Sequence, residues 1–154
     1  MIRSIAFVLC LSASAAWANQ ESPRLTVAEG DFAAQRAEIE ADLADGKTYR
    51  EISASDRTKV RESLNRIEGM LEGVASVDSL NEEAKARLFN DQEQVNNILT
   101  SAAADSRLVC ERSAPTGSNR KITTCQTVAE RDRRRDRDQG NLRDMQRGIM
   151  PANR

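Results

Sequence analysis

The sequence predicts a mainly α-helical fold: a small bundle of about three helices, one disulfide-closed β-hairpin and a charged C-terminal helix. Up to about residue 104, apolar residues recur every three or four positions, which is the period of an amphipathic helix. Residues 105–127 instead are rich in Val, Ile and Thr around a cluster of turn formers, the pattern of a hairpin. Aromatic residues make up only 3% of the chain, so a core must be built from small aliphatic side chains.

Residues 1–18 have the pattern of a secretory signal peptide. Arg3 supplies a positive charge, residues 4–16 form an apolar run, and Ala16-Trp17-Ala18 fits a small-x-small cleavage site. We therefore expect an exported protein, periplasmic or secreted, whose mature chain begins at Asn19. The apolar run is too short for a permanent anchor, so no transmembrane segment is expected after cleavage.

Residues 19–30 are predicted to be a flexible leader, and residues 31–104 a helical region. A first helix is expected at about 31–44, because Asp31 is a good N-cap and Asp45-Gly46 is a C-cap signal. Tyr49 lies in the following connection, where it can cover a helix end.

The second helix, at about 55–72, has the clearest apolar period. Its apolar residues are spaced 4, 3, 4, 3, which forms a seam too short for a stand-alone coiled coil: Val60, Leu64, Ile67, Leu71 and Val74. We expect a neighbouring helix to cover this seam. A third helix is predicted from the capping box Ser79-Leu-Asn-Glu82 to about residue 103, antiparallel to the second.

Residues 105–127 are predicted to form a β-hairpin in which Cys110 faces Cys125 and Arg112 faces Thr123. Cys10 is removed with the signal, so Cys110 and Cys125 are an even pair in an oxidising compartment, which predicts a disulfide. Two reduced thiols or two metal ligands are the disfavoured alternative, because the chain has no His to complete a zinc shell.

Residues 128–154 are predicted to be a charged C-terminal helix and tail that is solvated, projecting or frayed. Charge is unevenly placed along the chain: residues 19–105 hold 18 acidic and 10 basic residues, and residues 106–154 hold 6 acidic and 12 basic ones. This asymmetry is typical of a basic interaction arm on an acidic body. It is equally explained by two halves that attract each other within the fold, an interpretation we slightly favour.

The sequence offers no catalytic constellation and no cofactor or metal site. The absence of His removes the commonest general base and every His-dependent triad. The candidate interaction residues flank or form the hairpin loop: Arg112, Thr116, Gly117, Ser118, Arg120 and Lys121. Nucleic acid is a disfavoured partner, because Asp residues alternate with the arginines and no aromatic residue stands among them for base stacking.

A pattern of residues resembles small exported proteobacterial proteins of unknown function. It comprises Cys110, the Thr116-Gly-Ser118 loop and Cys125-x-Thr-x-Ala-Glu130, followed by an Arg-rich helix. Proteins of that group carry a signal peptide, a Cys-flanked Thr-Gly-Ser loop and a charged C-terminal helix. The resemblance implies export and a disulfide hairpin, and it implies no activity.

The function that fits these features is a non-enzymatic interaction or envelope-associated module. The sequence does not identify its partner. The candidates are an envelope protein and an anionic polymer. Two alternatives stay open. One is a small carboxylate-dependent hydrolase, or an inhibitor of one, and the other is a self-associating structural helical protein.

Overall fold

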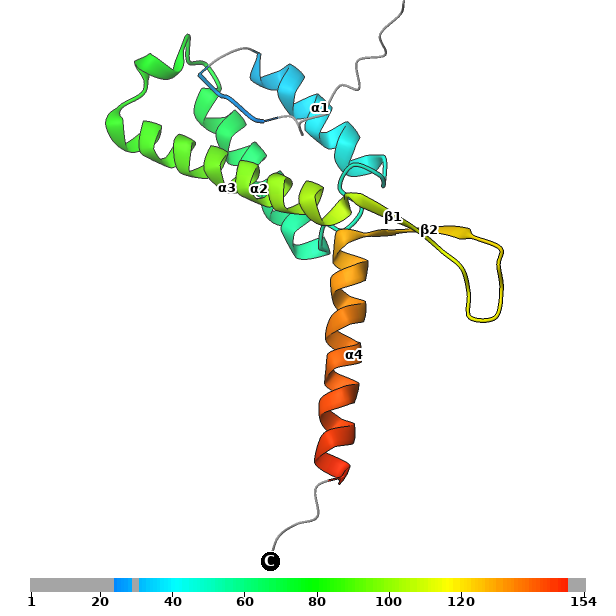
Figure 1. Ribbon diagram of the computed structural model, residues 1–154. Helices are drawn as coiled ribbons and strands as arrows, with labels where there is room; N and C mark the ends of the chain where they lie inside the picture. Colours follow the sequence, from blue (N-terminus) through cyan, green and yellow to red (C-terminus); the bar gives the residue numbers. More distant parts are fainter. Residues whose placement is uncertain (1–23, 29–30, 150–154) are drawn as a thin grey trace, which may run out of the picture.

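The computed structural model describes residues 24–28 and 31–149. The predicted signal peptide, its cleavage site, most of the predicted leader and the tail from residue 150 lie outside the described residues. The predicted fold class is confirmed: the described chain is mainly α, with one two-stranded antiparallel hairpin and a C-terminal helix (Figure 1). In order, the elements are α1 (Phe32–Ala44), α2 (Ala54–Leu71), η1 (Val77–Ser79), α3 (Glu82–Ser106), β1 (Leu108–Ser113), β2 (Ile122–Thr127) and α4 (Val128–Ile149).

The bundle is built on the antiparallel pair α2 and α3, with α1 packed across it (Figure 1). The seam predicted on α2 is its buried face, because Val60, Leu64 and Ile67 are completely covered. From α3, Leu88, Val95 and Leu99 meet them in the core. Completely covering a Leu or Ile side chain stabilises a fold by about 1.5–3 kcal/mol, so this interface contributes strongly to stability.

Local sequence sets both ends of α1. The side chain of Asp31 accepts a hydrogen bond from the Ala33 N–H at 2.9 Å, as an N-cap does. At the other end, Gly46 has φ +66°, a left-handed conformation that glycine adopts without a Cβ penalty. Tyr49 then turns into the core with only 1% of its surface exposed.

The predicted start of α3 at Ser79 is wrong. Ser79 ends the short 3-10 turn η1, and the helix begins three residues later, at Glu82. The side chain of Asn81 accepts the Ala84 N–H at 2.8 Å and so takes the N-cap position. Ser79 and Asn81 are both cap-forming residues, and Ser79 is the last residue of the 3-10 turn, so the cap falls on Asn81.

Residues 25–27, within the predicted leader, pack against the bundle. Leu25 and Val27 are buried, at 1% and 5% exposure. The Asn96 side chain donates to the Leu25 carbonyl at 3.0 Å and accepts the Leu25 N–H at 2.9 Å. Gln92 accepts the Val27 N–H at 2.8 Å. Gln35 of α1 bonds the Thr26 backbone in the same two-way manner as Asn96 bonds Leu25. Amide side chains of α1 and α3 therefore supply the hydrogen bonds that a neighbouring strand would give this segment.

The predicted register of the hairpin is confirmed. Cys110 is opposite Cys125 and Arg112 is opposite Thr123, as expected. The two cysteines form a disulfide with a Cα–Cα distance of 4.0 Å. Much of the hairpin is exposed, since Leu108 and Ile122 keep 57% and 50% of their surface in solvent.

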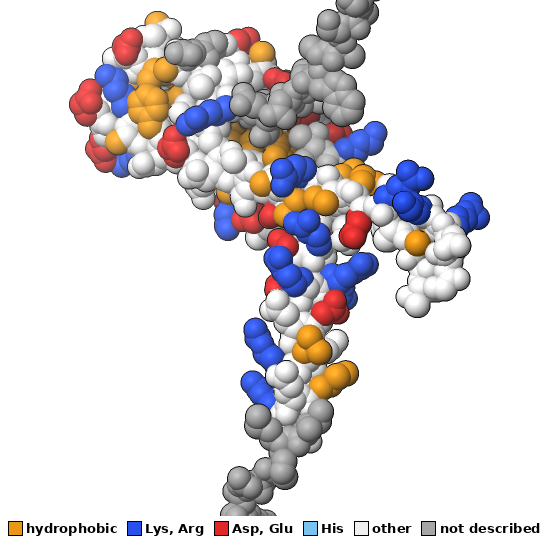
Figure 2. Space-filling view, in the orientation of Figure 1, with side chains coloured by type: hydrophobic (Ala, Val, Ile, Leu, Met, Phe, Trp, Pro, Cys, Tyr) orange, Lys and Arg blue, Asp and Glu red, His pale blue; other side chains and the backbone are white. Residues whose placement is uncertain are grey.

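The hairpin and α4 leave the same end of the bundle in different directions. In Figure 1, α4 stands away from the bundle as a long single helix, and the two strands extend sideways from its root. Figure 2 shows Lys and Arg side chains distributed along α4 and over the hairpin. No helix within the described ranges has an apolar stretch long enough to cross a membrane.

Candidate functional site

The predicted interaction residues form the tip and flanks of the hairpin, and all six are exposed: Arg112, Thr116, Gly117, Ser118, Arg120 and Lys121. The tip is a tight turn in which the Ser118 N–H donates to the Pro115 carbonyl at 2.9 Å. Gly117 has φ +84°, the value that the third position of a type II turn requires. The Ser118 hydroxyl accepts the Arg120 N–H at 3.1 Å, so this Ser has a local structural role.

The three cations of the hairpin are not neutralised by neighbouring carboxylates. Within residues 24–28 and 31–149, neither Arg112 nor Arg120 nor Lys121 forms a salt bridge. Their charges therefore face solvent from a disulfide-closed loop.

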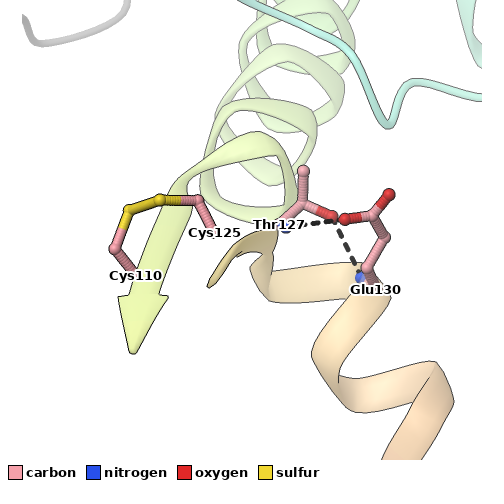
Figure 3. The surroundings of a disulfide bond; sticks show 4 residues. All are labelled: Cys110, Cys125, Thr127 and Glu130. Carbon is pink, nitrogen blue, oxygen red and sulfur yellow. Dashed lines mark hydrogen bonds between the residues drawn. A yellow bond between two sulfur atoms is a disulfide. The ribbon is translucent and has the colours of Figure 1, made fainter. Parts of the chain in front are cut away.

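A reciprocal capping box fixes the root of α4. Thr127 is completely buried, and its hydroxyl accepts the Glu130 N–H at 3.0 Å. In return the Glu130 carboxylate accepts the Thr127 N–H at 2.9 Å (Figure 3). Two of the N–H groups that a helix start leaves unpaired are satisfied in this way. The last residue of β2 thus serves as the N-cap of α4, two positions after the disulfide.

Glu51, in the connection between α1 and α2, joins this root to the bundle. One carboxylate oxygen accepts the Thr127 hydroxyl at 2.7 Å, and the other accepts the Arg133 guanidinium at 2.9 Å. These bonds, first that from Arg133 and then that from Thr127, hold the pKa of Glu51 below its ordinary value. The backbone N–H of Glu51 also donates to the Ser106 hydroxyl at 2.9 Å.

An open cleft of about 440 Å³ lies between β2 and α4. One wall is formed by three successive residues of β2, and the other by one carboxylate and three arginines of α4: Thr124, Cys125, Gln126, Glu130, Arg133, Arg134 and Arg137. Arg133 is engaged by Glu51. Arg134 and Arg137 form no salt bridge within the part of the chain that the structure describes.

Sequence reasoning missed this cleft and the network at its root. A local signal for the root was present, because Thr127-x-x-Glu130 is a capping box ahead of a helix. No local signal identifies Glu51, which lies 76 residues before Thr127. The structure brings the predicted disulfide next to the cleft, through Cys125, and leaves the predicted loop residues farther out along the hairpin.

The carboxylates offer little support for acid–base catalysis. Glu51 and Asp56 line a second cleft of about 320 Å³ together with Asp105. Hydrogen bonds from Lys59 and Ser53 lower the pKa of Asp56, and the hydrogen bonds from Arg133 and Thr127 lower the pKa of Glu51. A general acid needs a raised pKa, so neither group is set up to donate a proton near neutral pH.

Among the described residues, one carboxylate has a raised pKa: Asp42 of α1, whose charge acts on the buried phenol of Tyr49 in the connection after that helix. Burial raises the pKa of Asp42, with further increases from Asp45 and Glu38. Burial, then the charge of Asp42, raises the pKa of Tyr49 to about 12. The Tyr49 hydroxyl is buried and has no hydrogen-bond partner among the described residues.

No protein-family model, curated protein or solved structure matches this chain.

Proposed function

We propose that this protein is an exported, non-enzymatic interaction module that acts in the periplasm or after secretion and contacts an anionic partner of the cell envelope. The observation that carries the proposal is the arrangement at one end of the bundle. There, a disulfide-closed hairpin and a projecting helix both present cations that have no salt-bridge partner among the described residues. Their common root is held by Glu51, so the two elements keep a defined relation to the bundle.

Two further features support an exported protein. A disulfide in an exposed hairpin is typical of an oxidising compartment, since cytosolic thiols are kept reduced. The signal-peptide pattern of residues 1–18 and the resemblance to small exported proteobacterial proteins agree with this location.

The proposal is tested by capturing partners from envelope fractions with the purified, oxidised protein, followed by mass-spectrometric identification. The variant Arg120→Glu with Lys121→Glu reverses two charges in the loop and should reduce recovery of the specific partner. The matched control, Lys85→Glu with Arg87→Glu, reverses two charges on α3, where each cation already has a local partner. Equal recovery by both variants and the wild type would contradict an interaction through the hairpin.

Self-association is a second candidate, and it has one observation in its favour. Leu142 and Met145 lie one turn apart on α4 and keep 59% and 64% of their surface exposed. Apolar residues at this spacing are typical of a helix that packs against another helix. Analytical ultracentrifugation of the wild type and of Leu142→Glu tests this candidate. A monomeric wild type at high concentration would rule it out.

A further inference from the structure

The wall of the cleft formed by β2 is an exposed sheet edge. Side chains of successive strand residues point to opposite faces, so a strand that lines a cleft with Thr124, Cys125 and Gln126 in a row presents its edge to it. The described sheet has two strands, and β1 pairs with the other edge of β2. The edge that faces α4 is therefore available for pairing.

The register identifies which backbone groups of β2 point away from β1. Opposed residues in an antiparallel pair alternate between hydrogen-bonded pairs, about 5.5 Å apart at Cα, and non-hydrogen-bonded pairs, about 4.5 Å apart. The Cα–Cα distance of 4.0 Å places Cys110 and Cys125 in the second class. The N–H and C=O groups of Cys125 and Thr123 consequently point away from β1. Thr127 fits this alternation, since its N–H is used outside the ladder, by Glu130.

The opposite wall supplies positive charge. Arg134 and Arg137 are three residues apart on α4 and line the same cleft. Arg133, next to them, is already engaged by Glu51. The cleft thus combines an unpaired strand edge with two available guanidinium groups.

We propose that the cleft between β2 and α4 binds an extended acidic peptide segment of a partner protein. The segment adds as a strand to β2 through the backbone groups of Thr123 and Cys125, and its carboxylates pair with Arg134 and Arg137. Strand addition of this kind draws affinity from backbone hydrogen bonds and specificity from alternate side chains. This inference rests on the proposed function and specifies the chemistry of the partner.

The chemistry of the cleft favours a peptide over a polyanion or a second copy of this chain. The strand edge offers N–H donors and C=O acceptors in alternation, and a peptide backbone satisfies both, whereas a phosphate polymer satisfies the donors alone. Symmetric pairing of β2 with β2 of a second copy would bring the two sets of arginines together. That arrangement is disfavoured, because like charges repel.

The test uses the full-length oxidised protein and a labelled peptide of about eight residues that alternates Glu with Val. Fluorescence anisotropy should show binding that weakens about tenfold when Glu is replaced by Gln in the peptide. Arg134→Glu with Arg137→Glu should weaken binding by at least as much. The matched control, Arg143→Glu with Arg147→Glu, reverses two charges farther along α4 and should leave binding nearly unchanged.

A backbone variant tests strand addition separately from charge. Thr123→Pro removes an N–H that points away from β1, on the strand edge that continues beyond the cleft, while sparing the ladder with β1, and it should abolish binding. Thr123→Ala controls for the lost side chain and should bind like the wild type. Amide hydrogen exchange on the wild type should show new protection at Thr123 and Cys125 in the presence of the peptide.

Several outcomes would overturn the inference. One is that both pairs of arginine variants weaken peptide binding equally, and another is that Thr123→Pro still binds the peptide. A third is that inorganic polyphosphate binds more tightly than the peptide. A fourth is that the protection at β2 comes from dimerisation, which ultracentrifugation would detect. Capture of an envelope partner by a protein that does not bind the peptide would overturn this inference and leave the proposed function intact. If the protein binds the peptide but captures no envelope partner whose recovery falls in the Arg120→Glu, Lys121→Glu variant, the proposed function is contradicted instead.

Discussion

Replacing Glu51 by Ala should loosen α4 and the hairpin from the bundle. The carboxylate of Glu51 reaches both Thr127, at the N-cap of α4, and Arg133, six residues farther along the chain. Thr127 is completely buried, so removing its acceptor leaves a buried hydroxyl without that hydrogen bond. The variant therefore acts on the joint and leaves the apolar core of the bundle unchanged.

The expected magnitude follows from the burial of the groups involved. A hydrogen bond to a charged group contributes about 1.5–3 kcal/mol, and the buried position of Thr127 places its bond to Glu51 within this range. The ion pair with Arg133 adds little, because 59% of the Arg133 side chain is exposed and solvent screens the pair. We expect a loss of about 2 kcal/mol in the free energy that holds the joint closed.

Amide hydrogen exchange measures this loss where it occurs. The Val128 N–H donates to the Arg107 carbonyl at 3.0 Å, and the Glu130 N–H donates to Thr127, so both amides report opening of the joint. A loss of about 2 kcal/mol corresponds to exchange about 30-fold faster in Glu51→Ala.

Glu83→Ala is the matched control for Glu51→Ala. It removes a carboxylate from an exposed pair with Arg87 and should leave the Val128 and Glu130 amides unchanged. Unchanged exchange in Glu51→Ala would refute the assignment of Glu51 as the connection between bundle and joint.

The pH dependence gives an independent check of the same carboxylate. The pKa of Glu51 is lower in the folded protein than its ordinary value of 4.5. A carboxylate with a lowered pKa stabilises the fold fully above the unfolded pKa and loses that contribution as the pH falls through the folded pKa. The difference between wild type and Glu51→Ala should therefore be constant at neutral pH and shrink below about pH 4.5. A difference that persists unchanged in acid would show that the charge of Glu51 is not what stabilises the joint.

Three other predictions address other parts of the molecule. Because much of the hairpin is exposed, reducing the disulfide should remove hydrogen-exchange protection from the strands, while the helical circular dichroism signal persists. Loss of the helical signal would mean that the hairpin nucleates the whole fold. Tyr49, the only tyrosine, should titrate near pH 12 when followed by ultraviolet absorbance. Because the unfolded state loses the phenol proton first, the free energy of unfolding should fall by up to about 1.4 kcal/mol per pH unit between pH 10 and 12. A titration near pH 10 would contradict the burial of this phenol. Asn96→Ala should lower the free energy of unfolding by about 2–3 kcal/mol in urea, because the buried Leu25 backbone loses two hydrogen-bond partners. The control Asn97→Ala replaces an exposed residue and should be nearly neutral. Equal effects of the two variants would contradict the docking of residues 25–27.

Elements with a strong local signal agree well with the sequence-based expectation. The bounds of α1 follow from a cap residue at each end, and the buried face of α2 follows from the spacing of its apolar residues. The pairing of Cys110 with Cys125 follows from the placement of two cysteines on opposite sides of one turn. In each case the determining residues lie close together in the chain, so a short window contains the necessary information.

Features that depend on distant partners were not predictable in this way. Residues 25–27 contain Leu and Val but no extended apolar period, and the hydrogen bonds of Leu25 and Val27 come from Asn96 and Gln92, at least 65 residues away. Asn96 stands among polar residues of α3, yet only 6% of its surface is exposed. The predicted start of α3 was wrong for a different reason. Ser79 and Asn81 are both acceptable N-cap residues, and local rules do not choose between them.

The uneven charge of the chain had two explanations, and the position of α4 separates them. If attraction between the acidic and basic halves held the fold together, the basic helix would lie along the acidic bundle. Among the described residues, Arg133–Glu51 is instead the one salt bridge that joins the two halves, and α4 stands away from the bundle (Figure 1). Most cations of the hairpin and α4 therefore do not contribute to folding through ion pairs with the bundle. Because screening acts over about 8 Å at physiological ionic strength, their field is felt only by a molecule that comes into contact with this end of the protein. That is the property expected of a docking surface, and it places the functional argument on Arg134, Arg137 and the hairpin rather than on the acidic bundle.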